Sequence, residues 1–187
     1  MVELVVADMM SKVSDRRAHV LLLQEKDGLR KIIVALGLLE AQAIAFSLRG
    51  IDVARPLTHD LFGSFAAAFG IGLQYVLIND INDGTFHAQL HYAKEGEVRD
   101  IDARTSDAVA LALRAGAPIY IKDELLNRMC VRDEANGAVS IPITAADEDT
   151  LRVAMENAVK EENYELAMKL KEEIDSRHQA SGDTMND

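Results

Sequence analysis

The segment Arg55-Pro-Leu-Thr-His-Asp60 places a cation, an imidazole and a carboxylate close together in the chain. Thr58 is a typical helix N-cap, which puts His59 and Asp60 in the first turn of a predicted helix, where free backbone N–H groups attract anions. A histidine beside a carboxylate can act as a general base, and an arginine can bind phosphate through two parallel hydrogen bonds. His59 and Asp60 are therefore candidate catalytic residues, and Arg55 is a candidate substrate-binding residue. The alternative is that Asp60 only complements the helix dipole and pairs with Arg55.

A second group of charged residues flanks an apolar segment further along the chain. Asp102 and Arg104 leave a predicted strand on the same face, and Asp107 lies at the start of the next predicted helix. Carboxylate oxygens are ligands that Mg²⁺ and Mn²⁺ prefer, so Asp102 and Asp107 are candidate ligands of a metal that could activate water. Asp107 is also a candidate catalytic residue, and Arg104 and Arg114 could bind an anionic substrate. The alternative is a pair of structural ion pairs, Asp102–Arg104 and Asp107–Arg114.

Other residues that could do chemistry have simpler explanations. His87 and His91 would form a zinc pair on a helix, but the alternation of apolar and polar residues around them predicts a strand, and no third ligand is near. Cys130 has no histidine partner in the sequence. The chain contains no serine nucleophile elbow, phosphate-binding P-loop or dinucleotide fingerprint. We therefore expect no organic cofactor.

Both charged groups lie where predicted strands and helices meet. Alternating patterns between turn signals such as Asp27-Gly28 and Glu95-Gly96 predict strands within residues 2–7, 19–25, 30–36, 73–78, 85–92, 97–103 and 118–121. Helical spacing predicts helices at 38–49, 58–69 and 123–129. Ser106 can N-cap a further helix, and Ala108–Leu113 within it are all apolar, so this helix should be buried almost all round.

The sequence contains an internal echo at a spacing of 65 residues. Ala43–Arg49 aligns with Ala108–Arg114, and each segment follows a predicted hairpin and precedes a second helix. This order indicates two related halves, which would form an α+β domain with an antiparallel sheet. Equivalent helix starts would then lie side by side. We therefore predict that His59 and Asp107 lie close together.

The C-terminal part of the chain differs from the rest. Residues 131–146 are polar and include Asn136-Gly137, which predicts a linker or a hairpin tip. Thr144 and Asp147 form a capping-box signal, and Asn163 can start a second helix, so residues 147–179 should form a helical hairpin of about 147–160 and 164–178. Its two helices should pack through Leu151, Met155, Ala158, Ala167, Leu170 and Ile174. Residues 180–187 should be disordered.

Two family resemblances follow from these motifs. Arg55–Asp60 and Asp102–Arg114 resemble the bifunctional nuclease (BFN) domain family, and the similarity runs from about Val2 to Met129. The spacing of Leu151, Met155 and Ala158, followed by Asn163-Tyr-Glu-Leu-Ala167, resembles the UVR motif, the interaction hairpin of the excision-repair proteins UvrB and UvrC. The first resemblance implies an enzyme that hydrolyses the phosphodiester bonds of DNA and RNA. The second implies a protein partner that binds through residues 147–179.

Composition limits the compartment and the surface of the protein. The longest apolar runs fall short of the roughly 18 residues that span a membrane, and the N-terminus lacks the basic region of a signal peptide, so we expect no membrane association. The single cysteine fits a reducing, cytoplasmic location. The net charge is −11: residues 1–146 carry 19 acidic and 15 basic side chains, and residues 147–187 carry 12 and 5. Neither part is the basic surface that usually binds nucleic acid.

Two functions therefore remain open. The chain is expected to be a nuclease with a BFN-like domain at 1–130, assisted by Mg²⁺ or Mn²⁺ and acting on DNA or RNA. The alternative is a non-catalytic, homo-oligomeric protein that regulates partners through its UVR-like hairpin. The acidic charge favours the alternative, and the family resemblance favours the nuclease.

Overall fold

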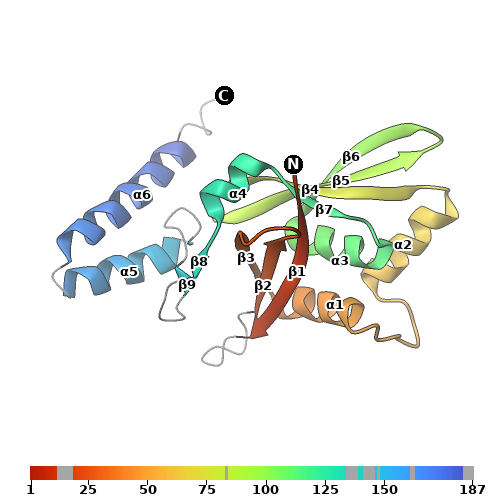
Figure 1. The fold of residues 1–187 in the computed structure, drawn as a ribbon, viewed down its shortest axis with the longest axis horizontal. Helices are drawn as coiled ribbons and strands as arrows, with labels where there is room; N and C mark the ends of the chain where they lie inside the picture. The colour runs from red at the N-terminus through yellow and green to blue at the C-terminus, as the bar shows by residue number, and fades with distance from the viewer. Residues whose placement is uncertain are drawn as a thin grey trace.

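A computed structural model describes residues 1–11, 19–82, 84–133, 139–140, 146, 148–160 and 163–182 (Figure 1). Its main strands are β1 (Val2–Ser11), β2 (His19–Glu25), β3 (Lys31–Leu36), β4 (Gly72–Asn82), β5 (Thr85–Lys94), β6 (Glu97–Arg104) and β7 (Ile119–Ile121). Its helices are α1 (Leu38–Leu48), α2 (Thr58–Ala68), α3 (Thr105–Ala115), α4 (Asp123–Met129), α5 (Glu148–Lys160) and α6 (Tyr164–Gly182). The α+β class predicted from the sequence is confirmed. None of the helices that the structure describes is long and apolar enough to cross a membrane.

The main sheet consists of two three-stranded antiparallel meanders with β7 between them. Its strand order is β3-β2-β1-β7-β4-β5-β6. Each meander is followed by a helix, α1 after β3 and α3 after β6, which agrees with the repeat seen in the sequence. The expectation of a wholly antiparallel sheet needs one correction, because β7 is antiparallel to β1 but parallel to β4. The reason is that α3 carries the chain back from the far edge of the sheet before β7 enters its centre.

Local sequence explains the hairpins of these meanders. In the β5–β6 turn, Glu95 and Gly96 both have positive φ angles, 52° and 86°, which the two-residue turns of twisted hairpins require. Along β5, Phe86, Ala88 and Leu90 are buried on one face, and the residues between them are only half-buried. The period of two therefore sets which face of the hairpin points into the core.

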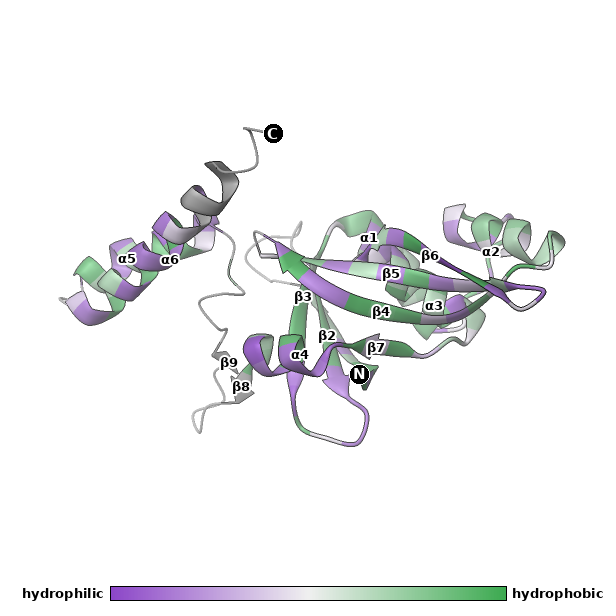
Figure 2. Ribbon diagram, turned by 90° about the horizontal axis from the view of Figure 1, so that it is seen from above, coloured by the Kyte–Doolittle hydropathy of each residue, from purple (hydrophilic) through white to green (hydrophobic). Residues whose placement is uncertain are grey.

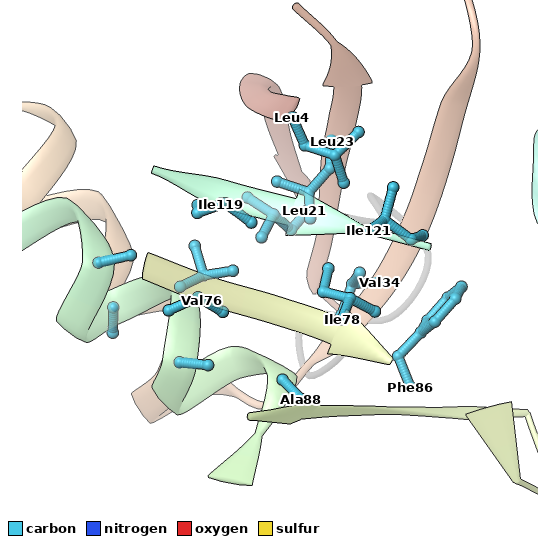
Figure 3. Close-up of a cluster of buried hydrophobic side chains, with 14 of the residues drawn as sticks. Leu4, Leu21, Leu23, Val34, Val76, Ile78, Phe86, Ala88, Ile119 and Ile121 are labelled. Carbon is cyan, nitrogen blue, oxygen red and sulfur yellow. The ribbon is translucent and has the colours of Figure 1, made fainter. Parts of the chain in front are cut away.

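The core lies between the two meanders and the helices. Figure 3 shows apolar side chains of both meanders and of β7, including Leu21, Val34, Val76 and Ile121, pointing into one cluster. α3 packs on α1, on α2 and on the strands of the second meander. In the predicted apolar run, residues 108–112 are all buried and Leu113 is partly buried. Three of these residues are alanines, whose small side chains let the helix approach the sheet closely.

The helix starts differ slightly from the sequence expectation. Thr58 and Ser106 were expected as N-caps, but the caps are Leu57 and Arg104, and the two hydroxyl residues lie inside the first turns. In α2 the capping role passes to Asp60, whose Oδ2 accepts a hydrogen bond of 2.9 Å from the Leu57 backbone N–H. A carboxylate at the third helical position accepts from the N–H of the N-cap residue, whereas an N-cap hydroxyl would accept from the N–H of the second or third helical residue.

The C-terminal helices form a hairpin with its own hydrophobic cluster. The predicted contact residues are confirmed: Leu151, Ala158, Ala167, Leu170 and Ile174 are buried in it, and Met155 packs against them. Asn163 starts α6 as expected, since its Oδ1 accepts a hydrogen bond from the Leu166 N–H. α6 continues to Gly182, past residue 179 where we expected the hairpin to end.

The segment before the hairpin contains two short paired strands. β8 (Arg132–Asp133) and β9 (Val139–Ser140) are antiparallel, in agreement with a hairpin within residues 131–146. Asn136-Gly137, Thr144 and Asp147 lie outside the described residues, as do residues 183–187.

Candidate functional site

The two charged groups predicted from the sequence meet at the starts of α2 and α3. His59 Nε2 lies 3.1 Å from Asp107 Oδ1, and both side chains are largely buried, at 17% and 31% exposure. The predicted proximity of these residues is confirmed. A carboxylate that accepts the Nε2–H of a histidine leaves Nδ1 as the basic nitrogen.

Asp107 is held from a second side by Arg104. The Arg104 Nε donates to Asp107 Oδ2 at 2.9 Å, and another guanidinium N–H donates to Oδ1 at 3.3 Å. Burial acts to raise the pKa of Asp107, but the hydrogen bonds from Arg104 and His59 outweigh it and leave this pKa below its ordinary value. Asp107 is therefore a carboxylate at neutral pH.

Arg104 also connects this group to α1. Its remaining guanidinium nitrogen donates to Glu40 Oε1 at 3.1 Å. Glu40 is the third residue of α1, just as Asp60 and Asp107 are the third residues of α2 and α3. One chain of contacts, Glu40–Arg104–Asp107–His59, therefore joins the N-termini of three helices.

Asp60 and Arg114 form a separate ion pair beside this chain. The Arg114 Nε donates to Asp60 Oδ1 at 2.5 Å, and the other two guanidinium nitrogens donate to the backbone carbonyls of Ala110 and Ala43. The hydrogen bond from Arg114, together with that from the Leu57 N–H, lowers the pKa of Asp60. Asp60 therefore has both oxygens engaged.

These contacts correct three pairings considered in the sequence. Asp60 pairs with Arg114 and not with Arg55, while Asp107 pairs with Arg104 and not with Arg114. The expected Asp102–Arg104 pair is replaced by Arg104–Asp107. These pairings arise because helix packing brings the ends of α2 and α3 together, and the spacing of the charges along the chain could not predict that packing.

Arg55 and Asp102 remain outside the network. Both are exposed, and neither makes a side-chain ion pair or hydrogen bond to any residue in the described ranges. Arg55 lies three residues before Thr58, the first residue of α2, and Asp102 lies on the edge strand β6 opposite Gln89. Arg55 is thus a cation whose guanidinium is available to an anion near the site.

The carboxylates do not form a ready metal site. Among the residues whose placement is described, no group of three or more His, Cys, Asp or Glu side chains could hold a metal ion. Both oxygens of Asp107 already bind Arg104 or His59, and the guanidinium would have to leave before a cation could bind. The Asp102–Asp107 ligand pair therefore lacks the converging oxygen donors that Mg²⁺ requires.

A cavity opens beside this network. It has a volume of about 510 Å³ and lies between α2, α3 and the strands β4 and β5. His59, Asp60 and Arg114 form its polar part, and the remaining lining is mostly apolar: Gly63, Ala66, Ala67, Ile71, Leu73, Tyr92, Leu111 and Ala115, with Ser64 and Gly72. Tyr92 is buried, which raises the pKa of its hydroxyl. A mainly apolar cavity with a few converging polar groups is typical of a ligand site.

Two residues that orient the site were missed in the sequence. Glu40 was missed because it lies 64 residues from its partner Arg104, although an acid in a first helical turn was a usable signal. Thr105 is buried and its Oγ1 donates to the Phe86 carbonyl at 2.8 Å, which fixes the start of α3 to β5.

The two other histidines considered in the sequence lie on β5, as predicted. His91 is buried, its ring stacks on Tyr75 at 4.0 Å, and its Nδ1 lies 2.6 Å from Asp100 Oδ1. These contacts give His91 a structural role in the sheet.

Comparison with known proteins assigns both parts of the chain. Residues 21–134 match the bifunctional nuclease domain, and residues 149–176 match the UvrB/uvrC motif. An uncharacterized protein of Mycobacterium tuberculosis (strain ATCC 25618 / H37Rv) is 40% identical over 157 residues, which cover 84% of each chain. Bifunctional nuclease 1 of Arabidopsis thaliana is 26% identical over 133 residues, which cover 70% of this chain and 41% of the plant protein. Bifunctional nuclease 1 of Oryza sativa subsp. japonica is 25% identical over 108 residues, 55% of this chain and 32% of that protein.

The domain match covers most of the sheet and helices α1 to α4, including every residue of the His59–Asp107 network. Both resemblances noted in the sequence are therefore confirmed, and the chain belongs to the bifunctional nuclease domain family.

Proposed function

We propose that this protein hydrolyses phosphodiester bonds of DNA or RNA at the His59–Asp107 site. The observation that carries the proposal is the 3.1 Å contact between His59 Nε2 and Asp107 Oδ1 at the wall of the 510 Å³ cavity. Membership of a nuclease family and the plant proteins named bifunctional nuclease support the choice of substrate.

In the proposed reaction His59 is the general base. Asp107 accepts the Nε2–H and fixes the ring, so the lone pair on Nδ1 can take a proton from an attacking water. The water oxygen then bonds to phosphorus, and the bond from phosphorus to the leaving alkoxide breaks. Arg55, whose guanidinium has no partner among the described residues, would bind a phosphate oxygen.

Arg104 and Arg114 have positioning roles in this proposal. Arg104 donates to both carboxylate oxygens of Asp107, and Arg114 holds Asp60 at the start of the same helix that carries His59. Each keeps N–H groups that can also face an anion, since a guanidinium has five. Mg²⁺ or Mn²⁺ could bind the oxygens of Asp107 only after Arg104 had moved away, so the assay below treats these metals as a variable.

The test is cleavage of labelled single-stranded DNA and RNA by purified protein, with Mg²⁺, with Mn²⁺ and with EDTA. His59→Asn should lower the rate at least about 100-fold, the usual scale for losing an acid–base group. Asp107→Asn should lower it as well and should change its pH profile, because the amide no longer holds the same tautomer of His59. His178→Asn, on the exposed part of α6, is the matched control and should cleave like the wild type.

Two results would contradict the proposal. Wild-type rates in folded His59→Asn protein would place the activity elsewhere or reveal a contaminant. No cleavage under any metal condition would favour the non-catalytic alternative. An activity abolished by EDTA and lost in Asp102→Asn would bring the metal back to the centre of the mechanism.

We also propose that the α5–α6 hairpin binds a protein partner. Its buried cluster is separate from the main core, yet large apolar side chains remain exposed on it: Val153, Val159, Tyr164, Leu166 and Met168. The match to the UvrB/uvrC motif supports a helical hairpin as the ligand. Binding of the full chain to a UvrB hairpin peptide should weaken in Met168→Glu, whereas no binding by the wild type would reject that ligand.

A further inference from the structure

The cavity beside His59 is bounded on one side by the small residues of helix α2. Gly63, Ala66 and Ala67 line it from this helix, and none of them has a side chain larger than a methyl group. Protein interiors are normally packed without large voids, and a helix that only covered the sheet would direct large apolar side chains at it. Figure 2 shows α2 at the margin of the molecule, with its ribbon coloured largely as apolar. The space of about 510 Å³ between α2, α3 and the sheet therefore suits a bound molecule.

Tyr92 supplies a polar group to this cavity that the protein leaves unpaired. The residue is only 5% exposed, and its ring packs against Phe62 with centroids 6.2 Å apart. Its hydroxyl makes no hydrogen bond to any residue in the part of the chain that the structure describes. A buried tyrosine hydroxyl usually has a hydrogen-bond partner, because an unpaired polar group in apolar surroundings is costly. We therefore expect the molecule that fills the cavity to supply the partner of Tyr92.

Most other polar groups of the cavity already have partners within the protein. Both oxygens of Asp60 accept hydrogen bonds, and the guanidinium of Arg114 donates to Asp60 and to two backbone carbonyls. Ser64 donates its hydroxyl proton to the Asp60 carbonyl and keeps only its capacity to accept. Burial raises the pKa of Tyr92, so its hydroxyl keeps its proton at neutral pH and can both donate and accept. Away from His59 the lining therefore offers apolar walls, two hydroxyls and an ion pair whose charges cancel, which suits an uncharged group better than a phosphate.

A second cavity adjoins the first at Ile71 and Tyr92, which line both. Its charged lining residues balance, two cations against two acids, and Arg99 donates to Glu97 at 3.0 Å. A surface without net positive charge does not attract a phosphate backbone. The phosphates of a bound strand should therefore stay at the His59 end, and Tyr92 should mark the inner end of a pocket for one uncharged group.

An unpaired nucleobase has the properties that this cavity requires. It is flat and uncharged, its edge carries hydrogen-bond donors and acceptors, and one sugar joins it to a phosphate. In a duplex each base is stacked and paired, so it enters a cavity only if it leaves the helix. We propose that the cavity binds the base next to the phosphate held at His59, with the Tyr92 hydroxyl bonded to the edge of that base. The inference rests on the nuclease function proposed above, and it makes unpaired strands the substrate class.

Binding without cleavage tests the base pocket. The probes are labelled hexathymidylate and a strand of the same length and charge that lacks every base, both with phosphorothioate linkages and in EDTA to suppress cleavage. By fluorescence anisotropy, the full chain should bind hexathymidylate at least about tenfold more tightly than the abasic strand. Tyr92→Phe removes only the hydroxyl and should weaken binding of hexathymidylate about fivefold, the scale of one hydrogen bond. The same change should not lower Tm, because the hydroxyl has no partner among the described residues, whereas a structural role would lower it.

Ala67→Leu fills the cavity, and Ala68→Leu is its matched control. Both alanines are exposed on α2, but only Ala67 lines the cavity. Ala67→Leu should weaken binding of hexathymidylate at least about tenfold and leave binding of the abasic strand unchanged. Ala68→Leu should bind both strands like the wild type. The proposal would be overturned if the wild type bound the two strands equally or not at all, or if the two leucine changes had equal effects.

Cleavage distinguishes this inference from the nuclease function on which it rests. An unpaired strand should be cleaved at least about tenfold faster than the same sequence in a duplex, because a paired base must first leave the helix. Selective binding of hexathymidylate by a wild type that cleaves nothing would reject the nuclease and support the base pocket. Equal cleavage of single and double strands, together with equal binding of the abasic strand, would support the nuclease and reject the base pocket.

Discussion

The Asp60–Arg114 ion pair ties α2 to α3, and we predict that it contributes substantially to the free energy of unfolding. Few apolar contacts hold α2, since Ala66 is its one fully buried residue and Phe62 packs on Tyr92 at its edge. The perturbation is a double-mutant cycle with Asp60→Asn and Arg114→Met. The amide keeps an oxygen for the Leu57 N–H, and methionine keeps much of the arginine volume.

The magnitude follows from the burial of the pair. Hydrogen bonds to charged groups contribute about 1.5–3 kcal/mol, and the exposures of 15% for Arg114 and 31% for Asp60 favour the lower half of this range. We expect a coupling free energy of about 1.5 kcal/mol. Asp60→Asn alone should cost about 2 kcal/mol, because a favourable charge at the helix N-terminus is also lost. Arg114→Met should cost about 2–3 kcal/mol, since the Ala43 carbonyl also loses its donor.

The assay is urea unfolding at pH 7 followed by circular dichroism at 222 nm, repeated as thermal melts. For a chain of this size, each kcal/mol corresponds to about 2–4 °C in Tm, so Asp60→Asn should lower Tm by about 4–8 °C. The control is the exposed pair Arg99–Glu97 in the same domain, at 78% and 75% exposure, whose coupling should not exceed about 0.5 kcal/mol. The reasoning would be refuted if the two substitutions changed the free energy of unfolding additively, so that the coupling free energy of Asp60 and Arg114 was no larger than that of Arg99 and Glu97.

Three further predictions concern stability. The pKa values of Asp60 and Asp107 are lower in the native protein than in the unfolded chain. Their contribution to the free energy of unfolding is therefore complete above the unfolded pKa of about 3.9 and is lost as pH falls below it. In urea titrations between about pH 5 and about pH 3, Asp107→Asn should lose less stability than the wild type. Gly63→Ala should raise the free energy of unfolding by about 0.5–1 kcal/mol, since nothing lies within 4 Å of the added Cβ and glycine is unfavourable inside a helix; a lower Tm would mean that this position needs glycine. A chain of residues 1–145 should keep the calorimetric transition of the main core, because the α5–α6 cluster is separate, and loss of that transition would make the hairpin integral to the domain.

Residue types and their spacing were sufficient to determine the elements of this protein. The period of two in β5 and the run of small apolar residues in α3 follow directly from which faces must be buried, so strand, helix and burial could be predicted. The same holds for the helical hairpin, whose contact residues repeat at helical spacing. The proximity of His59 and Asp107 was also predicted correctly, although the repeat pairs α3 with α1 and the contact itself is made by α2.

Tertiary structure alone decided which charges pair and which apolar face stays uncovered. Asp60 and Arg114 are 54 residues apart, and Glu40 and Arg104 are 64 apart, so their contacts depend on how α1, α2 and α3 pack. The phenylalanines of α2 show the same limit, because Phe62, Phe65 and Phe69 repeat at helical spacing yet are 41%, 57% and 56% exposed. A helical period reports that one face must avoid water, but it does not distinguish the core of the same chain from the surface of another molecule, because burial removes apolar area from water in either case.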